Sequence, residues 1–297
     1  MGFSFDGSLV AMVTPMTAAG DVDLPAWERL VHWHAIAGTG GLVVGGTTGE
    51  SATLTETEVE TLVRSARALF PADRPIIVGS GTNSTATSIA RGARFAAAGA
   101  DALLAVTPYY NKPTQEGLIA HYSAIGEASP VPVILYNVPG RTAVDLKPAT
   151  VAALAGRRNL VAIKESTMSV ERIAELVRLV AGRMVVLAGD DPVAAGALLA
   201  GARGVISVTA NVAPRRMRKM VAAALSGDAR AAHAIDATLA PLHEALFIEP
   251  NPIPSKWALQ QMGLIGPGIR LPLTPLSAEA QASVSAALLA AALDDAE

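Results

Sequence analysis

A lysine near the end of a short apolar run is the first side chain that could do covalent chemistry: Lys164, in the segment LVAIKES (residues 160–166). Side chains alternate between the two faces of a strand, so Ala162 and Ser166 share a face with Lys164 and leave it room to extend. Burial disfavours the ammonium form, and a neutral amine attacks a ketone to form an imine. A lysine that pairs with a carboxylate or reaches water would fit the same segment.

Two adjacent threonines, Thr47 and Thr48, stand in the glycine-rich segment GGTTGES (residues 45–51). Glycines let a backbone approach a ligand closely, and hydroxyl groups with free amides can hold a carboxylate. No lysine follows these glycines and the segment has no GxSxG pattern, so it is neither a nucleotide loop nor a serine-nucleophile elbow. A turn that simply requires glycine is the alternative.

Three of the chain's 4 tyrosines gather in two segments, TPYYNKP with Tyr109 and Tyr110, and YNVPGRT with Tyr136. Tyrosines that only fill a core would be more scattered. A phenol donates and accepts protons, so it can pass one between a lysine, a hydroxyl group and a substrate. Arg141 in the second segment offers a planar fork that suits a carboxylate, although a surface salt bridge would account for it as well.

Two later apolar runs bring Gly189 and Ile206 into consideration, because their backbone groups could contact a small ligand. Packing inside the protein would explain both residues equally well. The histidines include no pair at metal-ligand spacing, and the chain has no cysteine. We therefore expect no metal site.

These residues fall at the ends of short apolar runs that recur about every 20 to 35 residues, with helical patterns between them. The runs are residues 9–15, 41–45, 75–79, 102–107, 133–137, 161–164, 184–188 and 204–208. Their continuous apolar character predicts parallel strands covered on both faces. Eight such units predict an α/β fold of the closed (β/α)8 TIM-barrel type, in which catalytic groups stand at the C-terminal ends of the strands.

The last part of the chain predicts a short all-helical C-terminal extension, with helices over residues 229–247, 254–262 and 277–292. We accordingly expect a catalytic barrel over residues 1–226 and the extension over residues 227–297. An open, doubly wound sheet is the alternative fold. It usually has fewer strands and a glycine-rich phosphate loop, and no GxGxxG or Walker A pattern is present.

Composition excludes several classes of protein. The 297 residues are 51% hydrophobic and 16% charged with a net charge of -3, which excludes a disordered chain and disfavours nucleic-acid binding. Mean hydropathy is +0.38, but no apolar run approaches the ~18 residues of a membrane span. The N-terminal segment MGFSFDGS lacks the basic and apolar parts of a signal peptide. We expect a cytoplasmic protein.

The order of these motifs resembles the dihydrodipicolinate synthase and N-acetylneuraminate lyase superfamily. The lysine on strand six, the tyrosine that ends strand five, and the segments GTTGE and YYNKP carry the likeness. It runs over residues 7–275 and includes FIEPNPIP (247–254) and RLPLTP (270–275). The resemblance implies a lyase of lysine and diaminopimelate biosynthesis that forms a Schiff base with pyruvate and needs no metal or organic cofactor.

The resemblance also implies roles for individual residues. Lys164 is expected to form the imine, and Tyr136 to transfer protons. Thr47 is expected to link Tyr136 to Tyr110 in a proton relay. Tyr110 is expected to come from a neighbouring subunit, so at least a dimer is required, and the family commonly forms a homotetramer, as a dimer of dimers.

Substrate binding is implied in the same way. Thr48 and the backbone at Ile206 are expected to hold the pyruvate carboxylate. Arg141 is expected to bind the carboxylate of the second substrate, L-aspartate 4-semialdehyde.

A possible allosteric site follows from the resemblance as well. Lysine-sensitive bacterial relatives bind L-lysine at a dimer interface near the segment after strand two. The residues that match this site are Ser51, Ala52, Asn83 and Tyr109. Glu56, Val59 and Thr87 do not match, because the sensitive relatives have His, His and Glu there. We therefore expect weak or absent inhibition by L-lysine.

Two alternatives to this function stay open. Another pyruvate-dependent aldolase of the superfamily, acting on a sugar acid or a hydroxy-oxo acid, would share Lys164 and Tyr136, although Arg141 and Thr47 favour the synthase. A non-catalytic paralogue would be expected to have lost a catalytic group, and none is missing.

Overall fold

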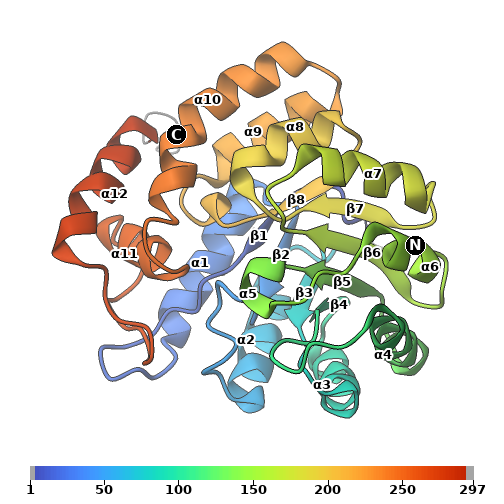
Figure 1. The fold of residues 1–297 in the computed structure, drawn as a ribbon. Helices are drawn as coiled ribbons and strands as arrows, with labels where there is room; N and C mark the ends of the chain where they lie inside the picture. Colours follow the sequence, from blue (N-terminus) through green and yellow to red (C-terminus); the bar gives the residue numbers. More distant parts are fainter. Residues whose placement is uncertain (1–3, 292–297) are drawn as a thin grey trace.

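A closed barrel of eight parallel strands forms the centre of the molecule in the computed structural model, which describes residues 4–291 (Figure 1). The strands are β1 (Gly7–Ala11), β2 (Gly41–Val44), β3 (Ile76–Gly79), β4 (Ala102–Val106), β5 (Val133–Asn137), β6 (Leu160–Glu165), β7 (Val185–Ala188) and β8 (Gly204–Ser207). They pair in sequence order, and β1 pairs with β8 to close the barrel. The predicted (β/α)8 barrel is confirmed, and the open doubly wound sheet is wrong.

Helices surround the strands, as Figure 1 shows. They are α1 (Leu24–Ala37), α2 (Glu56–Leu69), α3 (Thr85–Ala98), α4 (Gln115–Ala128), α5 (Pro139–Thr142), α6 (Pro148–Leu154), α7 (Val170–Val180), α8 (Ala194–Leu199) and α9 (Pro214–Leu225), with short 3-10 turns η1 (Asp191–Val193) and η2 (Thr209–Asn211). The C-terminal extension holds α10 (Ala229–Ala245), α11 (Ile253–Gln261) and α12 (Ala278–Ala291). Residues 1–3 and 292–297, which the predicted domain ranges include, lie outside the described residues.

Capping residues fix where several of these helices begin and end. Asp23 accepts a hydrogen bond from the backbone of Ala26 at the start of α1. Thr55 and Glu58 form a capping box at the start of α2. Both arrangements satisfy backbone N–H groups that have no partner inside the helix. Gly38 ends α1 in the left-handed conformation that glycine adopts without a steric cost.

The first strand differs from its prediction over residues 9–15, because the sheet ends at Ala11. The Met12 N–H still donates to the Val43 carbonyl of β2 at 3.0 Å, but the next residues bond to loops instead of a strand. The Val13 N–H donates to Asn211 Oδ1 at 3.1 Å, and the Thr14 hydroxyl donates to the Gly49 carbonyl at 2.8 Å. The apolar run thus continues past the strand into the loops at the barrel mouth.

Strand side chains build two apolar layers. One set fills the barrel interior, including Leu9, Ile77 and Ala162. The alternate set, including Val10 and Ile163, packs between the strands and the helices. The two layers explain the continuous apolar runs, since both faces of each strand are covered.

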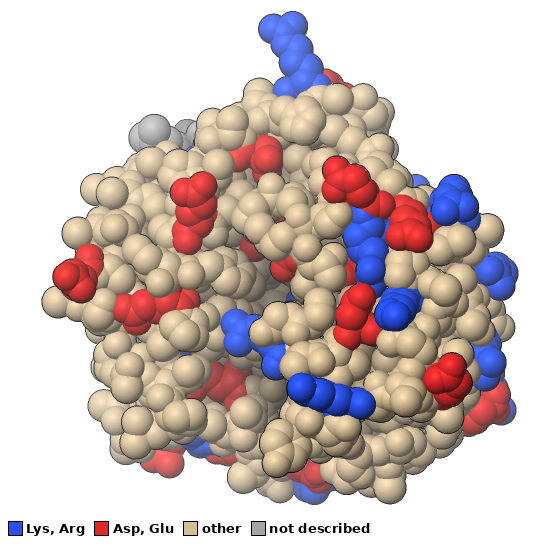
Figure 2. Space-filling view, in the orientation of Figure 1, with Lys and Arg blue, Asp and Glu red and all other residues tan. Residues whose placement is uncertain are grey.

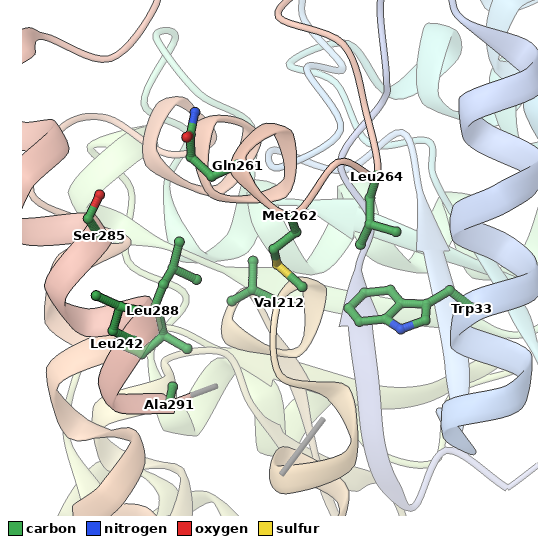
Figure 3. Close-up of a pocket in the computed structure, with 10 residues that line it drawn as sticks. Trp33, Val212, Leu242, Gln261, Met262, Leu264, Ser285, Leu288 and Ala291 are labelled. Atoms are coloured by element: carbon green, nitrogen blue, oxygen red, sulfur yellow. The ribbon is translucent and has the colours of Figure 1, made fainter. Parts of the chain in front are cut away.

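The extension packs against the barrel's helices and, together with α1, lines an open apolar cavity of about 510 Å³ (Figure 3). Trp33 of α1, Leu242 of α10 and Leu288 of α12 are among its lining residues. Residues of α10–α12 share one hydrophobic core with the outer layer of the barrel. The predicted division at residue 226 therefore separates two parts of one packed body.

Charged side chains of both signs are interspersed on the face seen in Figure 2, which is hollowed near its centre. Lys and Arg do not form a continuous basic patch on this face, which a nucleic-acid-binding surface would require. No helix within residues 4–291 is both long and apolar enough to cross a membrane.

Candidate active site

Lys164 lies near the C-terminal end of β6, between Tyr136 on β5 and Leu187 on β7 in the strand register. Its side chain is only 5% exposed, and Nζ lies 4.3 Å from the centroid of the Tyr136 ring. Lys164 forms no salt bridge to any residue of the described range. The lysine therefore neither reaches bulk water nor is bound to a carboxylate, and the alternative interpretation of its segment is wrong.

Two adjoining cavities lie beside Lys164. The inner cavity has a volume of about 50 Å³ and is lined in part by Lys164. The outer cavity has a volume of about 180 Å³. The two cavities adjoin, since Thr47, Tyr136 and Arg141 line both. The inner cavity also includes Thr48 and, from the later strand ends and the extension, Ser166, Gly189, Asp190, Phe247 and Asn251. A water-sized group needs roughly 10–15 Å³, so the inner cavity suits a small molecule of a few heavy atoms.

The larger cavity in the extension is a weaker candidate for chemistry, although it has about ten times this volume, 510 against 50 Å³. None of its lining side chains is ionisable. The inner cavity instead brings an amine, a phenol, a carboxylate and a guanidinium together at the strand ends, where barrel enzymes carry their catalytic groups.

Gly189 borders Lys164 so closely that any side chain here would force Ser166 and Lys164 to move. A Cβ atom at this position would lie 2.0 Å from Ser166 Oγ and 2.9 Å from Lys164 Cε. Its N–H donates to the Glu165 carbonyl at 2.8 Å. Packing thus accounts for this glycine, and a contact between its backbone and a ligand stays a prediction.

The GGTTGES segment forms the turn after β2, and the C-terminal extension holds it in place. Glu50 adopts a positive φ of 58°, and its carboxylate pairs with Lys256 of α11. The Arg270 N–H also donates to this carboxylate at 3.2 Å. Burial lowers the pKa of Lys256, and the charge of Glu50 opposes this shift. Thr48 is held separately, since the Asn251 side-chain amide donates to its hydroxyl oxygen at 2.9 Å.

Arg141 stands at the mouth of the cavities on the single-turn helix α5. It is exposed and forms no salt bridge with any residue in the described part of the chain. The alternative of a surface salt bridge is therefore wrong for this structure. An unpaired guanidinium at a cavity mouth is available to an incoming carboxylate.

Three residues singled out from the sequence do not line these cavities. Tyr110 is 88% exposed. Ile206 is buried in the apolar interior of the barrel. Asn83 lies outside both linings, and its carbonyl accepts a hydrogen bond from the Asn111 side chain at 2.9 Å.

The other residues of the predicted allosteric site lie in or near the outer cavity. Ser51, Ala52 and Tyr109 line it. Of the three positions that differ from lysine-sensitive relatives, Val59 is fully buried, and Glu56 pairs with Arg94 at 2.7 Å. The Thr87 hydroxyl donates to Ser84 Oγ at 3.0 Å.

Sequence reasoning missed two polar residues of the inner cavity, Asp190 and Asn251. Asp190 had a usable signal, because it directly follows Gly189 beyond a strand end. Burial raises the pKa of its carboxyl group, and the nearby Lys164 opposes this shift. Asn251 had no such signal, since it lies in the extension, 203 positions from Thr48.

Glu165, next to Lys164 in sequence, was also missed as an ionisable group of interest. It lies on the opposite face of β6, buried between the barrel and α7, where the Asn137 side chain donates to it at 3.0 Å. Arg172 of α7 lies 3.9 Å from its carboxylate. Burial raises the pKa of Glu165 to about 7, although Arg172 and Asn137 both favour the charged form.

Comparisons with known proteins agree with this geometry. The model of the dihydrodipicolinate synthetase family matches residues 4–291. The 4-hydroxy-tetrahydrodipicolinate synthase of Methylococcus capsulatus is 52% identical over 282 residues, 95% of this chain and 97% of the relative.

Solved structures show the same likeness. The chloride-inhibited dihydrodipicolinate synthase from Acinetobacter baumannii, crystallised with pyruvate, superimposes with a TM-score of 0.96 at 48% identity, covering 98% of this chain and 100% of the other. A monomeric dihydrodipicolinate synthase variant superimposes with a TM-score of 0.95 at 42% identity, covering 97% of each chain.

Proposed function

Because this chain belongs to the dihydrodipicolinate synthetase family, we propose that it condenses pyruvate with L-aspartate 4-semialdehyde to give 4-hydroxy-tetrahydrodipicolinate, a step of lysine and diaminopimelate biosynthesis. One observation carries the proposal. An almost fully buried lysine stands beside a tyrosine in a small cavity at the C-terminal end of a (β/α)8 barrel. No described acidic side chain is paired with the lysine, so its amine is available to a keto acid.

The reaction begins with attack of the Lys164 amine on the keto carbon of pyruvate. The adduct loses water and becomes a protonated imine. This step needs a group that moves protons to and from the departing oxygen. The Tyr136 phenol, whose ring lies 4.3 Å from Nζ, is the group we assign to this role.

The imine then acts as an electron sink. Carbon 3 of pyruvate loses a proton, and the resulting enamine attacks the aldehyde carbon of the second substrate to form a carbon–carbon bond. The amine of that substrate attacks the imine carbon, closes the ring and releases Lys164 unchanged. The whole reaction consumes one molecule of each substrate and releases one water.

Carboxylate recognition is divided between the two ends of the cavities. We assign the pyruvate carboxylate to the Thr48 hydroxyl and the backbone near Gly189 and Ile206. Arg141 is assigned to the carboxylate of the second substrate, and its place at the mouth without an ion-pair partner supports this role. Thr47 lines both cavities with Tyr136, which supports its place in a proton relay.

The exposed Tyr110 supports an oligomeric enzyme. A phenol that is 88% exposed outside the cavities of its own chain can complete the relay only from a neighbouring subunit. We therefore propose at least a dimer, in which Tyr110 of each subunit contacts Thr47 of the other and completes its proton relay. Two such dimers would form a homotetramer.

We also propose that L-lysine inhibits this enzyme weakly or not at all. At two of the three differing positions, Val59 is fully buried and the Glu56 carboxylate is paired with Arg94. Neither offers a free polar group to a bound amino acid. Activity measured against rising L-lysine should stay flat through the micromolar range, and half-inhibition in that range would overturn the proposal.

Substrate choice tests the function as a whole. The purified enzyme should turn over pyruvate with L-aspartate 4-semialdehyde at a kcat/KM at least about 100-fold above that for sialic acid or 2-keto-3-deoxy sugar acids. A preference for one of these sugar acids would favour another aldolase of the superfamily. No turnover of any of them would favour a non-catalytic paralogue.

A further inference from the structure

The C-terminal extension contributes a buried amide to the cavity of the catalytic lysine. Asn251 lies between α10 and α11, and its Nδ2 donates to Thr48 Oγ1 at 2.9 Å. Both side chains are buried, and both line the inner cavity together with Lys164. A segment at the far end of the chain thus touches the threonine assigned to the pyruvate carboxylate.

The direction of this hydrogen bond has a chemical consequence. A threonine hydroxyl has one hydrogen to donate, while an asparagine Nδ2 can only donate. With Asn251 as the donor, Thr48 Oγ1 is the acceptor, and its own hydrogen is free for another partner. The Thr48 hydroxyl makes no other hydrogen bond to the residues at 4–291. A carboxylate, which only accepts, is the complementary ligand.

We propose that Asn251 is a positioning residue of the pyruvate site, which turns the Thr48 hydroxyl into a dedicated donor to the pyruvate carboxylate. The inference rests on the proposed function and deepens it. Asn251, which lies outside the barrel strands and their loops, would thereby take part in substrate recognition.

A second contact between the extension and the threonine loop holds Thr48 and Asn251 close to each other. Lys256, five residues after Asn251, forms the buried ion pair with Glu50, two residues after Thr48. The Arg270 N–H also donates to Glu50 at 3.2 Å. The extension therefore contacts the threonine loop at two points, through Asn251 and through Lys256. The buried ion pair fixes the loop relative to the extension and so holds Thr48 close to Asn251.

The aspartate variant provides the sharpest test, because Asn251→Asp keeps the shape of the side chain and replaces its donor by an acceptor. The aspartate would take the Thr48 hydrogen that pyruvate needs. A hydrogen bond to a charged group corresponds to roughly a 10- to 100-fold change in binding. We expect the KM for pyruvate to rise by that factor in Asn251→Asp, with kcat within about threefold of the parent.

A purely structural role of Asn251 predicts that Asn251→Ala raises the KM for pyruvate more than Asn251→Asp does, which is the reverse of what a positioning role predicts. If Asn251 only filled space, the isosteric Asn251→Asp would resemble the parent, and the truncated Asn251→Ala would be the more damaged enzyme. If it positions Thr48, Asn251→Ala should raise the KM for pyruvate less than Asn251→Asp does. Wild-type KM in Asn251→Asp would overturn the proposal.

A double-mutant cycle separates action through Thr48 from a direct effect of the new charge. Asn251→Ala should raise the KM for pyruvate in the parent but have no further effect in Thr48→Val, because the hydroxyl that it orients is gone. An equal effect in both backgrounds would also overturn the proposal. This cycle remains informative if Asn251→Asp fails to fold.

Failure of this inference can be told from failure of the proposed function. Borohydride reduction at saturating pyruvate should still trap an adduct on Lys164 in Asn251→Asp. A parent enzyme without any adduct would refute the Schiff-base function itself. An adduct in the parent together with unchanged KM in every Asn251 variant would refute the positioning role alone.

Discussion

At the scale of single residues, the active site depends on Lys164 being buried without a carboxylate partner. The Tyr136 ring lies 4.3 Å from its Nζ, and Gly189 leaves space for the lysine side chain. An amine with no ion-pair partner is free to approach a ketone and attack it. Tyr136 is placed to supply and remove protons for that attack.

Removal of the Tyr136 hydroxyl should therefore slow catalysis with little effect on folding. The hydroxyl makes no hydrogen bond to the described residues, so Tyr136→Phe should unfold within a few degrees of the parent. General acid–base catalysis contributes about 10² to 10⁴ in rate, and we expect a fall of that size in kcat. Steady-state kinetics beside a thermal melt would measure both, and a kcat within threefold of the parent would contradict the role.

The site could be predicted from the sequence wherever its residues stand at strand ends. Lys164, Tyr136 and Thr47 were found because a barrel brings the C-terminal ends of its strands together. Asn251 could not be found in this way, since its contact with Thr48 joins segments 203 positions apart through the packing of the extension. Whether Tyr110 reaches a partner's site depends on a second chain, which no pattern in one chain specifies.

At the scale of the elements, β6 carries ionisable groups on both of its faces. Lys164 faces the cavity, while Glu165 faces α7 and is 2% exposed. Alternation along the strand keeps the two side chains apart. The carboxylate is held by Asn137 and lies near Arg172, so β6 is tied to both β5 and α7 on its outer face.

The raised pKa of Glu165 predicts a pH-dependent stability. The folded protein holds this proton up to about pH 7, whereas the unfolded chain loses it near 4.5. The group therefore contributes stability that is full below pH 4.5 and is lost as the pH rises through about 7, by up to roughly 3 kcal/mol. In Glu165→Gln, the free energy of unfolding should not show this decrease with rising pH. Urea unfolding of both proteins between pH 5 and 8 tests it, and parallel pH profiles would contradict it.

The ion pair between α11 and the threonine loop predicts a second stability effect. Lys256→Met leaves the Glu50 carboxylate buried without its partner, which costs about 3–5 kcal/mol. Lys219, exposed on α9 and without a salt bridge among the described residues, offers a matched control, and Lys219→Met should change stability by less than about 0.5 kcal/mol. Chemical denaturation measures both. Equal effects of the two substitutions would show that the buried pair does not hold the loop.

At the scale of the whole molecule, the fold could be predicted closely because most strand residues are apolar and most helices begin with a capping side chain or a proline. Helices α1 (24–37) and α9 (214–225), for example, each have a proline in their first turn. The exception is the first strand, whose apolar run continues into loops that bond to side chains such as Asn211. Apolar composition reports burial, and burial does not distinguish a strand from a buried loop.

The arrangement of subunits can be tested by mixing inactive variants. If Tyr110 completes a partner's site, Tyr110→Phe and Lys164→Ala subunits form mixed dimers with one complete site. Random pairing of equal amounts should then recover about a quarter of parental activity. Tyr110 acting within its own chain would give no recovery beyond the residual activity of the two variants. Activity after co-refolding, compared with each variant alone, decides between these outcomes.

The most direct test of the central claim is reductive trapping of the imine. After incubation with pyruvate and borohydride, mass spectrometry should find one modified residue per chain, Lys164, heavier by the mass of pyruvic acid less one oxygen atom. Lys164→Ala should remain unmodified under the same conditions. An unmodified parent enzyme, or an adduct only on another lysine such as Lys256, would contradict the account.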